Sequence, residues 1–424
     1  MKEVVIIGGG VSGLTCGLNL AENGYRVTIL EKETALGGLA RSFFIKGNWI
    51  PLTYHHVMIT DKLTQAYIKK FGFLKELRWI RSSQSFWYEN RIYPLSNLWD
   101  ICAFSPLDFK SKVRLSLFGL YVWFKKDWDN LRGIDCNKWL NKMVGKKTSE
   151  LLFQNLMDIK FHMPLSNIST AWLGNRLHQN IRTRSTYGCI ESGWQQLFES
   201  MAGEVIRRKG KIVKDFEVTK IAANNIEGMD GDTNRVSMSA DIIVSTVPPP
   251  IFKRILYLPD KTQSLLESLE YKSIISFVCG SSQNLSQYYW SVVLKPNLFF
   301  GGFFKHTAIC PSAIRDGESI YYFFTYLDTN DPILDYKEED IKNLYLCDIK
   351  KLFPDFCLNW YKIFKIKFSQ PVFIRNYDNP PIELADSIYL AGVYRQFPRP
   401  RTMDAAFYSG LETAKYIINK YGKN

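Results

Sequence analysis

The 424-residue chain lacks long apolar runs, paired cysteines and clustered histidines. No stretch approaches the roughly 18 apolar residues that cross a bilayer, so an integral membrane protein is not expected. The eight cysteines are scattered from Cys16 to Cys357 without a C-x-x-C pair. That pattern fits a reducing cytoplasm and argues against a zinc site or a disulfide framework. Only His55 and His56 are neighbouring histidines, and an adjacent pair is poor ligand geometry, so no metal is expected.

Acidic residues are the minority, since 41 aspartates and glutamates oppose 54 lysines and arginines, a net charge of +13. A basic protein attracts nucleic acid, anionic membranes or anionic substrates. The lysines are dispersed and no nucleic-acid motif is present, so we expect a small-molecule substrate and no nucleic acid. Charge without a function stays open as an alternative. Only three residues precede the first predicted strand, so no signal peptide is expected and the predicted location is the cytoplasm.

What the sequence does contain is a complete dinucleotide-binding unit at its start. The β-branched run at 4–7 predicts a strand, and apolar residues at helical intervals from 14 to 21 predict a helix. Residues 26–30 predict a second strand. Three glycines in G-x-G-x-x-G spacing join the first strand to the helix. This order is that of a βαβ unit whose glycine loop holds a diphosphate.

Each residue of this loop has a physical task. Gly8 allows the tight turn, Gly10 lets the backbone approach a pyrophosphate, and Gly13 lets helix and strand pack closely. Ser12 lies in the first helical turn, whose unpaired N–H groups suit a diphosphate. Glu31 ends the second strand, where it can accept hydrogen bonds from a ribose diol. We expect all five residues to contact the cofactor.

A second glycine pair indicates which cofactor binds. The stretch Leu36-Gly37-Gly38-Leu39-Ala40-Arg41 resembles the FAD signature of the amine oxidase and protoporphyrinogen oxidase superfamily. In that family the second loop wraps FAD and the arginine faces its phosphates, whereas plain nicotinamide dehydrogenases lack the extension. The resemblance therefore implies FAD, and it adds as contacts Lys32, Gly38, Leu39, Ala40 and Arg41.

The resemblance covers nearly the whole chain, and the sequence is similar to the bacterial, protoporphyrinogen oxidase-like branch of the family. It implies an α/β fold, with a Rossmann-like FAD domain of the glutathione-reductase type, a mixed-sheet substrate domain and a helical insert at about 95–182. The FAD domain is expected to comprise 1–55, 187–250 and 356–424, and the substrate domain 56–186 and 251–355. Further matches are Tyr54-His55-His56, Tyr93-Pro94, Lys160-Phe161, Arg176, Glu191, Ser245-Thr246, His306-Thr307, Gln370-Pro371 and Tyr389-Leu390-Ala391-Gly392.

The resemblance also assigns cofactor contacts later in the chain. Val218 falls where the family's backbone meets the adenine, and Gly392, Val393 and Met403 fall near the ribityl chain and flavin ring. Two departures stand out. Many relatives have an aspartate at the position of Val393, and amine oxidases proper have a lysine near the flavin N5 where this chain has Ser276. The second departure argues against amine oxidation in particular, though not against flavin chemistry.

The catalytic candidates are Tyr54, His55 and His56. Residues 42–49 are predicted to run as one extended segment over the cofactor, which would carry these side chains to the flavin ring. A histidine there can take a proton or orient a polar substrate. A packed, structural histidine pair is the alternative.

The substrate-binding candidates are Lys160, Arg176 and His306. The two cations can hold an anionic substrate group, or they can be ordinary solvated side chains. His306 is open to a structural reading as well.

Three functions remain open at this point. The first is an FAD-dependent oxidoreductase that dehydrogenates a small or lipid-like substrate by hydride transfer to flavin N5. The second is a redox-neutral mutase similar to UDP-galactopyranose mutase, for which the insert offers several arginines. The third is a flavin-bound scaffold without catalysis.

The segment from Pro106 to Lys126 is a predicted helix with an aromatic, apolar stretch between lysines and arginines. Such a helix can lie in the interface of an anionic membrane as a peripheral contact. A buried core helix is the alternative.

Overall fold

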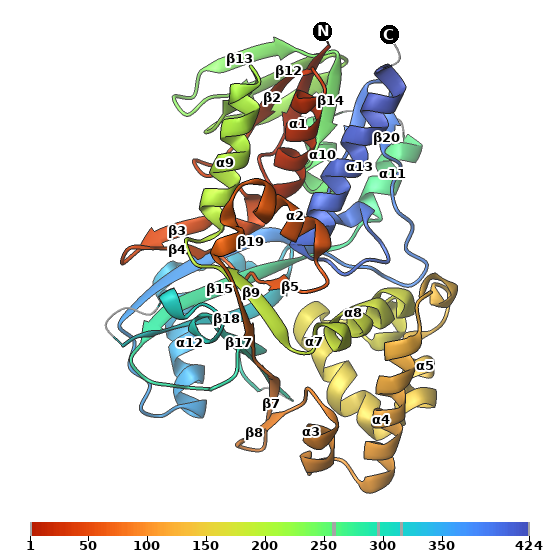
Figure 1. Cartoon of the computed structure of the whole chain (residues 1–424), viewed down its shortest axis with the longest axis vertical. Helices are drawn as coiled ribbons and strands as arrows, with labels where there is room; N and C mark the ends of the chain where they lie inside the picture. Colours follow the sequence, from red (N-terminus) through yellow and green to blue (C-terminus); the bar gives the residue numbers. More distant parts are fainter. Residues whose placement is uncertain (1, 257–259, 295–296, 314–316, 423–424) are drawn as a thin grey trace.

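The computed structural model describes residues 2–256, 260–294, 297–313 and 317–422. Figure 1 shows three regions of the molecule. A sheet with α1, α9 and α13 lies at the top, a second sheet lies below it, and the helices α3 to α8 lie at the lower right. The predicted α/β fold is confirmed. No helix in these ranges is long and apolar enough to cross a bilayer.

The upper sheet has six strands in the order β10-β2-β1-β14-β21-β20. All neighbours pair in parallel except β20 and β21. Its central strands are short runs of Val, Ile and Leu because both faces are buried. One face packs against the helices α1, α9 and α13, and the other against apolar residues such as Phe216, Ile221 and Ile226. The strands are β1 (Glu3–Ile7), β2 (Arg26–Leu30), β10 (Lys211–Val213), β14 (Ile242–Ser245), β20 (Glu383–Ala385) and β21 (Ile388–Leu390).

Small residues bring the covering helices close to this sheet. A Cβ on Gly17 of α1 (Val11–Glu22) would lie 2.7 Å from Ile29 Cδ1 of β2. A Cβ on Gly410 of α13 (Met403–Tyr421) would collide with the Ser12 carbonyl oxygen. The first and last helices are therefore in direct contact, and α9 (Trp194–Arg207) packs beside them.

The lower sheet has seven strands in the order β19-β15-β18-β17-β16-β7-β8. All its pairs are antiparallel except β16 with β7. Glu89 and Asn90 form the turn of the β7–β8 hairpin with φ of 47° and 60°, which short polar residues tolerate best. The strands are β7 (Gln84–Tyr88), β8 (Arg91–Pro94), β15 (Tyr271–Ser281), β16 (Trp290–Val293), β17 (Gly302–Lys305), β18 (Ser319–Asp328) and β19 (Trp360–Pro371).

The stretch predicted to be a helical insert is helical in the structure. Its helices begin where polar side chains cap them: Asp108 accepts from Ser111 N–H (2.9 Å) and Asp135 from Lys138 N–H (2.9 Å). The helices are α3 (Leu98–Ala103), α4 (Phe109–Phe124), α5 (Cys136–Val144), α6 (Lys146–Thr148), α7 (Asn155–Phe161) and α8 (Thr170–Thr183).

In the part of the chain that the structure describes, three small sheets and four further α-helices complete the fold, apart from short 3-10 and π segments. Strands β11 (Glu217–Ala222), β12 (Asn225–Met229) and β13 (Arg235–Ser239) form one sheet, β5 (Val57–Met58), β9 (Thr186–Ile190) and β6 (Leu77–Arg81) the second, and β3 (Ser42–Ile45) and β4 (Asn48–Pro51) the third. The helices are α2 (Lys62–Lys70), α10 (Pro249–Ile255), α11 (Asp260–Glu267) and α12 (Glu338–Leu352).

The prediction of a single extended segment at 42–49 is wrong. The chain turns at Lys46 and Gly47, both with positive φ, and β3 returns on itself as β4. The segment therefore does not span the distance that we expected from its length. The expected start of the last FAD-domain segment, residue 356, precedes β19, and β19 pairs with β15 of the seven-stranded sheet. The division into two domains stays a prediction.

Candidate functional site

The glycine loop between β1 and α1 has the shape that a diphosphate site needs. Gly8 has a φ of 105°, and a Cβ on Gly13 would collide with the Gly8 carbonyl oxygen. Gly10 is the N-cap of α1 and no side chain caps this helix end. The N–H groups of the first turn therefore remain directed at a ligand site, with the positive end of the helix dipole.

The two predicted glycine loops touch each other. Gly37 N–H donates to the Gly9 carbonyl oxygen (2.9 Å), and a Cβ on Gly10 would lie 3.7 Å from Gly38 Cα. Arg41 follows, with its guanidinium 3.2 Å from a Glu33 carboxylate oxygen. Because both loops meet over the N-terminus of α1, one extended diphosphate can contact them together.

Glu31 lies beside the two glycine loops, which together form a glycine cradle, and its carboxylate is already hydrogen-bonded. It accepts from Gly9 N–H (2.7 Å) and from Glu33 N–H (3.0 Å). Burial raises the pKa of Glu31, and these two hydrogen bonds oppose the rise. Phe216 N–H donates to the Glu31 carbonyl oxygen (2.9 Å), which brings β11 and its buried Val218 to the end of β2. Ribose and adenine contacts are thus predicted on adjacent segments.

The other predicted cofactor residues lie around the same cradle and differ in their exposure and in their hydrogen bonds. The Ser12 hydroxyl donates to the Ala406 carbonyl oxygen (2.9 Å), so this side chain ties α1 to α13 while its backbone stays in the first turn. Ala40 is buried and Leu39 is exposed, and the Lys32 ammonium lies 3.9 Å from Glu33. These contacts with a cofactor stay predictions.

The C-terminal contacts converge on this cradle from the other end of the chain. Gly392 N–H donates to the Ser409 hydroxyl of α13 (2.7 Å), and Val393 starts a short 3-10 turn. Thr402 caps α13 by accepting from Ala405 N–H, which makes Met403 the first helical residue. Since Ala406 bonds Ser12, this helix start lies next to the glycine loop.

The three catalytic candidates have different surroundings. Tyr54 stacks on Phe304 (centroids 3.7 Å apart) and its hydroxyl lies 2.5 Å from the Tyr326 hydroxyl. The His56 Nδ1 lies 2.9 Å from the Tyr289 hydroxyl. His55 instead bonds locally through Nδ1 to the Thr53 carbonyl oxygen (2.9 Å). The structure thus gives the two adjacent histidines different hydrogen-bond partners.

Three cations gather near Tyr54 and His56, and their partners in the described ranges are neutral. The Lys160 ammonium lies 5.2 Å from the Trp290 ring. The Arg176 guanidinium donates to Gln179 Oε1 (2.8 Å). The Arg401 guanidinium stacks 4.6 Å from the Phe161 and Trp172 rings and donates to the Pro371 carbonyl oxygen. Uncompensated positive charge therefore accumulates in a largely buried region, which favours an anion there.

Burial is the main cause of the pKa shifts in this region, and neighbouring positive charges add to them. Burial lowers the pKa of Lys160 well below its ordinary value, and the charges of Arg176 and Arg401 lower it further. Burial lowers the pKa of Arg401 to about 10. Burial also lowers the pKa of His56 to about 3, with Arg176, His55 and Lys160 adding to the shift. His56 is therefore neutral near pH 7 and offers one ring nitrogen as a hydrogen-bond acceptor.

Asp61 is connected to Arg176 through Gln179. Gln179 Nε2 donates to Asp61 Oδ1 (2.9 Å), and Met58 N–H donates to Asp61 Oδ2 (2.9 Å). Burial raises the pKa of Asp61 to about 7 from an ordinary 3.8, and the charge of Asp404 adds to the rise. The nearby arginine therefore lacks a fully ionised partner at neutral pH.

Asp61→Asn is expected to gain stability relative to the wild type as pH rises from about 4 to about 7. The folded wild type binds the Asp61 proton more tightly than the unfolded chain, so its stability falls across that window. The slope is at most about 1.4 kcal/mol per pH unit for one proton. Urea unfolding at several pH values measures the difference, with Asp355→Asn on the surface as the control. A pH-independent difference would contradict the expectation.

The structure places His306 apart from Lys160 and Arg176. Its ring lies beside Cys189 and Cys310, and it packs against Tyr322 with centroids 5.8 Å apart. Conversely, sequence reasoning gave no site role to Arg401 or Tyr326, and it noted Tyr289 only as a match to the family. Arg401 precedes α13, Tyr289 precedes β16 and Tyr326 lies on β18, so no local motif joins them.

Comparisons with known proteins agree with this geometry. The model of the family described as "Flavin containing amine oxidoreductase" matches residues 11–418. An L-amino-acid oxidase of Crotalus adamanteus is 26% identical over 296 residues, covering 64% of this chain and 56% of its own length. The chain thus spans little more than half of that curated relative.

Three solved structures share the fold at low sequence identity. A protein provisionally described as a protoporphyrinogen oxidase, from Exiguobacterium sp. 255-15, has a TM-score of 0.79 at 17% identity, with 99% of each chain covered. Reduced UDP-galactopyranose mutase has 0.78 at 16%, covering 100% of this chain and 97% of the other. Putrescine oxidase bound to putrescine has 0.69 at 14%, with 99% of each covered.

At the level of the family, the prediction of FAD as cofactor is confirmed, and the prediction of an oxidoreductase agrees with the family's description. The glycine cradle, the uncapped start of α1 and the buried Glu31 fit that cofactor. The chain belongs to the family of flavin containing amine oxidoreductases.

Proposed function

We propose that the protein is an FAD-dependent oxidoreductase that dehydrogenates a small substrate carrying an anionic group, by hydride transfer to flavin N5. The observation that carries this proposal is the gathering of Lys160, Arg176 and Arg401 beside His56, with neutral partners only. A substrate carboxylate or phosphate offsets this charge, since a charge-assisted hydrogen bond is worth about twice a neutral one. The positively charged region also disfavours a cationic amine.

The flavin, when bound, supplies the hydride acceptor, and this chain orients the substrate. The cations hold its anionic end, and the aromatic rings of Tyr54, Phe304 and Trp290 form an apolar wall that excludes water. In the tautomer whose Nδ1–H donates to the Tyr289 hydroxyl, the other nitrogen of His56 is free to accept a proton from the substrate. A substrate anion offsets the charges of Arg176 and Lys160, which lower the pKa of His56, and so makes it a stronger base.

A redox-neutral mutase reaction is the second candidate. It is favoured by the same three cations, which suit a sugar-nucleotide diphosphate, and by the fold shared with UDP-galactopyranose mutase. The two reactions differ in whether the substrate itself reduces the flavin.

An anaerobic substrate screen tests the proposal. The purified holoenzyme is mixed with hydroxy and amino carboxylates, phosphorylated alcohols, sugar nucleotides and simple amines, and flavin absorbance is followed. We expect bleaching by an anionic compound. Bleaching by cationic amines alone would overturn the proposal, and isomerisation of a sugar nucleotide by chemically reduced enzyme without net flavin oxidation would favour the mutase.

His56→Asn is expected to slow flavin reduction by about 10²-fold, on the usual scale of acid–base catalysis. His55→Asn is the matched control, because His55 bonds only to Thr53 and its loss should mainly lower the melting temperature. Stopped-flow reduction with a substrate found in the screen measures both rates. Equal rates in the two variants would remove His56 from proton transfer.

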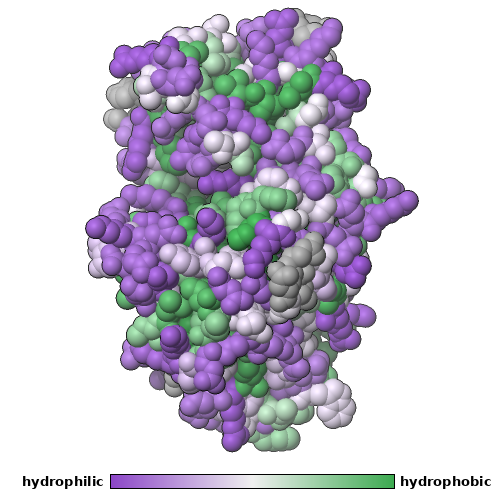
Figure 2. Space-filling model, turned by 90° about the vertical axis from the view of Figure 1, so that its left-hand side faces the viewer, coloured by the Kyte–Doolittle hydropathy of each residue, from purple (hydrophilic) through white to green (hydrophobic). Residues whose placement is uncertain are grey.

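We propose further that α4 docks the protein on an anionic membrane as a peripheral contact. One face of α4 packs inward through Leu115, Phe118 and Val122. The other face leaves Leu117 60%, Leu120 52% and Phe124 73% exposed. The buried-helix alternative therefore describes only half of this helix. Figure 2 shows, for comparison, a face of the molecule on which hydrophilic side chains surround smaller hydrophobic areas.

Basic residues flank this apolar face. They are Lys110, Lys112, Lys125 and Lys126. Apolar side chains with lysines at both ends suit the interface of an anionic bilayer, where each lysine near the surface adds about 1 kcal/mol.

The wild type is expected to co-sediment with phosphatidylserine vesicles at low salt and to be released by high salt. Leu120→Ser combined with Phe124→Ser should weaken binding at least several-fold, because both side chains face outward and leave the core intact. Ile206→Ser, an exposed apolar residue of α9, is the control. Equal sedimentation of all three proteins would remove α4 from membrane contact.

A further inference from the structure

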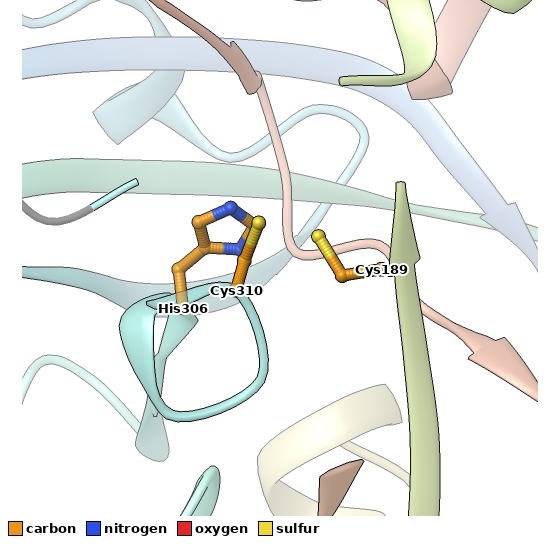
Figure 3. A group of neighbouring side chains, drawn as sticks. All are labelled: Cys189, His306 and Cys310. Atoms are coloured by element: carbon orange, nitrogen blue, oxygen red, sulfur yellow. The ribbon is translucent and has the colours of Figure 1, made fainter. Parts of the chain in front are cut away.

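Three potential metal ligands converge between β9 and the turn that follows β17. They are Cys189, His306 and Cys310, and Figure 3 shows their side chains directed toward one another from the two segments. Their sulfur and nitrogen ligand atoms all lie within 4.8 Å of one another, and all three residues are buried. Two thiols and an imidazole form a ligand set that zinc prefers.

Two separate backbone segments position these side chains, one carrying His306 and Cys310 and the other carrying Cys189. Cys310 N–H donates to the His306 carbonyl oxygen (3.0 Å), which closes one helical turn and puts the two side chains on the same face. Cys189 comes from β9, held by its antiparallel pairing with Arg78 of β6. Two separately anchored segments thus meet with ligands already facing each other.

The polar bonding of this cluster is incomplete. His306 is 3% exposed, and its Nδ1 atom is buried without a hydrogen-bond partner in the described ranges. A buried, unpaired polar atom is rare and costs free energy. An ion at the cluster, coordinated directly by one ring nitrogen, gives this imidazole the interaction that the surrounding protein does not fully provide.

We infer that Cys189, His306 and Cys310 bind one Zn²⁺ ion, with the fourth coordination position open. Tetrahedral zinc with bonds of about 2.3 Å to sulfur and about 2.0 Å to nitrogen sets its ligand atoms roughly 3.5 to 3.8 Å apart. The observed spacing therefore needs ligand movements of about an ångström or less.

The fourth position opens toward a small cavity that all three ligands line. Glu191 also borders this cavity, whose volume of about 10 Å³ is at the lower limit for one water ligand. The Ser312 hydroxyl lies 3.6 Å from Cys310 Sγ, where it can stabilise a bound thiolate.

Zinc at this place clamps the wall of the proposed substrate region. Tyr187 precedes Cys189 by two residues on β9 and packs against the His56 ring, with centroids 5.0 Å apart. Phe304 precedes His306 by two residues and stacks on Tyr54. The ion therefore acts as a positioning element, and the inference does not depend on which substrate the enzyme uses.

The experiment measures zinc in the FAD-containing protein, kept reduced, loaded with Zn²⁺ and dialysed. We expect about one zinc per protein by mass spectrometry, and X-ray absorption at the zinc edge should show two sulfur neighbours. Cys189→Ser, His306→Gln and Cys310→Ser should each lose the bound zinc. Cys279→Ala, which removes a buried thiol from β15, should retain it.

Zinc should also raise the melting temperature of the wild type and of Cys279→Ala, but not of the three ligand variants. Absence of retained zinc in the wild type overturns the inference. Retention of as much zinc by His306→Gln and Cys310→Ser as by the wild type also overturns it. A Cys189–Cys310 disulfide in place of zinc in the isolated protein also overturns it. If a ligand variant fails to fold, the sulfur count in the wild type decides alone.

Discussion

Gly10→Val is expected to leave the protein folded and to abolish its retention of FAD. Gly10 has a φ of −72° and a ψ of 178°, an extended conformation that valine adopts readily. Its Cβ would meet Gly38 only at 3.7 Å, an ordinary contact. The branched side chain would nevertheless fill the space over the start of α1, through which the backbone must approach the pyrophosphate.

Two other glycines provide the controls for this prediction. Gly13→Val should lose folded protein itself, because its Cβ would collide with the Gly8 carbonyl oxygen. Gly203→Val on α9 should keep both fold and flavin, since a Cβ there has no neighbour within 4 Å. Flavin-to-protein absorbance, circular dichroism and melting temperature separate the three outcomes. A Gly10→Val protein with a full complement of FAD would show that the diphosphate lies elsewhere.

Arg176→Gln is expected to raise the KM for an anionic substrate by about 30-fold or more. Removing one partner of a buried, hydrogen-bonded charge pair costs about 2–5 kcal/mol, and each 1.4 kcal/mol is tenfold in affinity. The Arg176 guanidinium holds its place through Gln179 and so meets the substrate in a fixed orientation. The rate of flavin reduction at saturating substrate should change less than KM does.

Arg182→Gln is the matched control, since Arg182 lies on the same helix but stacks on Trp123. A neutral analogue of the substrate should bind Arg176→Gln and the wild type alike, because the lost interaction is with charge. Perturbation of the flavin spectrum measures both affinities. A uniform loss for charged and neutral ligands would indicate that Arg176 supports the cavity without contacting the anion.

The cofactor end of the molecule could be predicted because its determinants are local. One strand, one glycine loop, one helix and Glu31 follow each other within the first βαβ unit, so spacing alone defines their geometry. The hairpin at 42–51 was predictable in principle from Lys46-Gly47, a turn sequence, but the apolar residues on both sides obscured it.

The substrate region resisted prediction because its parts come from distant segments. Lys160 is on α7, Arg176 on α8, and Arg401 precedes α13, so their proximity depends on packing that no sequence period encodes. The cluster of Cys189 with His306 and Cys310 has the same cause. Only the spacing of His306 and Cys310 is local, and scattered cysteines gave no sign that Cys189 would join them.

The contact between α1 and α13 has a consequence for biosynthesis. The glycine loop leaves the ribosome early, but its partners are synthesised much later. β1 pairs with β14, β14 pairs with β21, and the Ser12 hydroxyl donates to the Ala406 carbonyl oxygen. Such long-range pairings close slowly and expose unpaired strand edges until they do. The flavin pocket therefore stays incomplete until residues 388–406 have been synthesised, and cofactor capture should follow their synthesis.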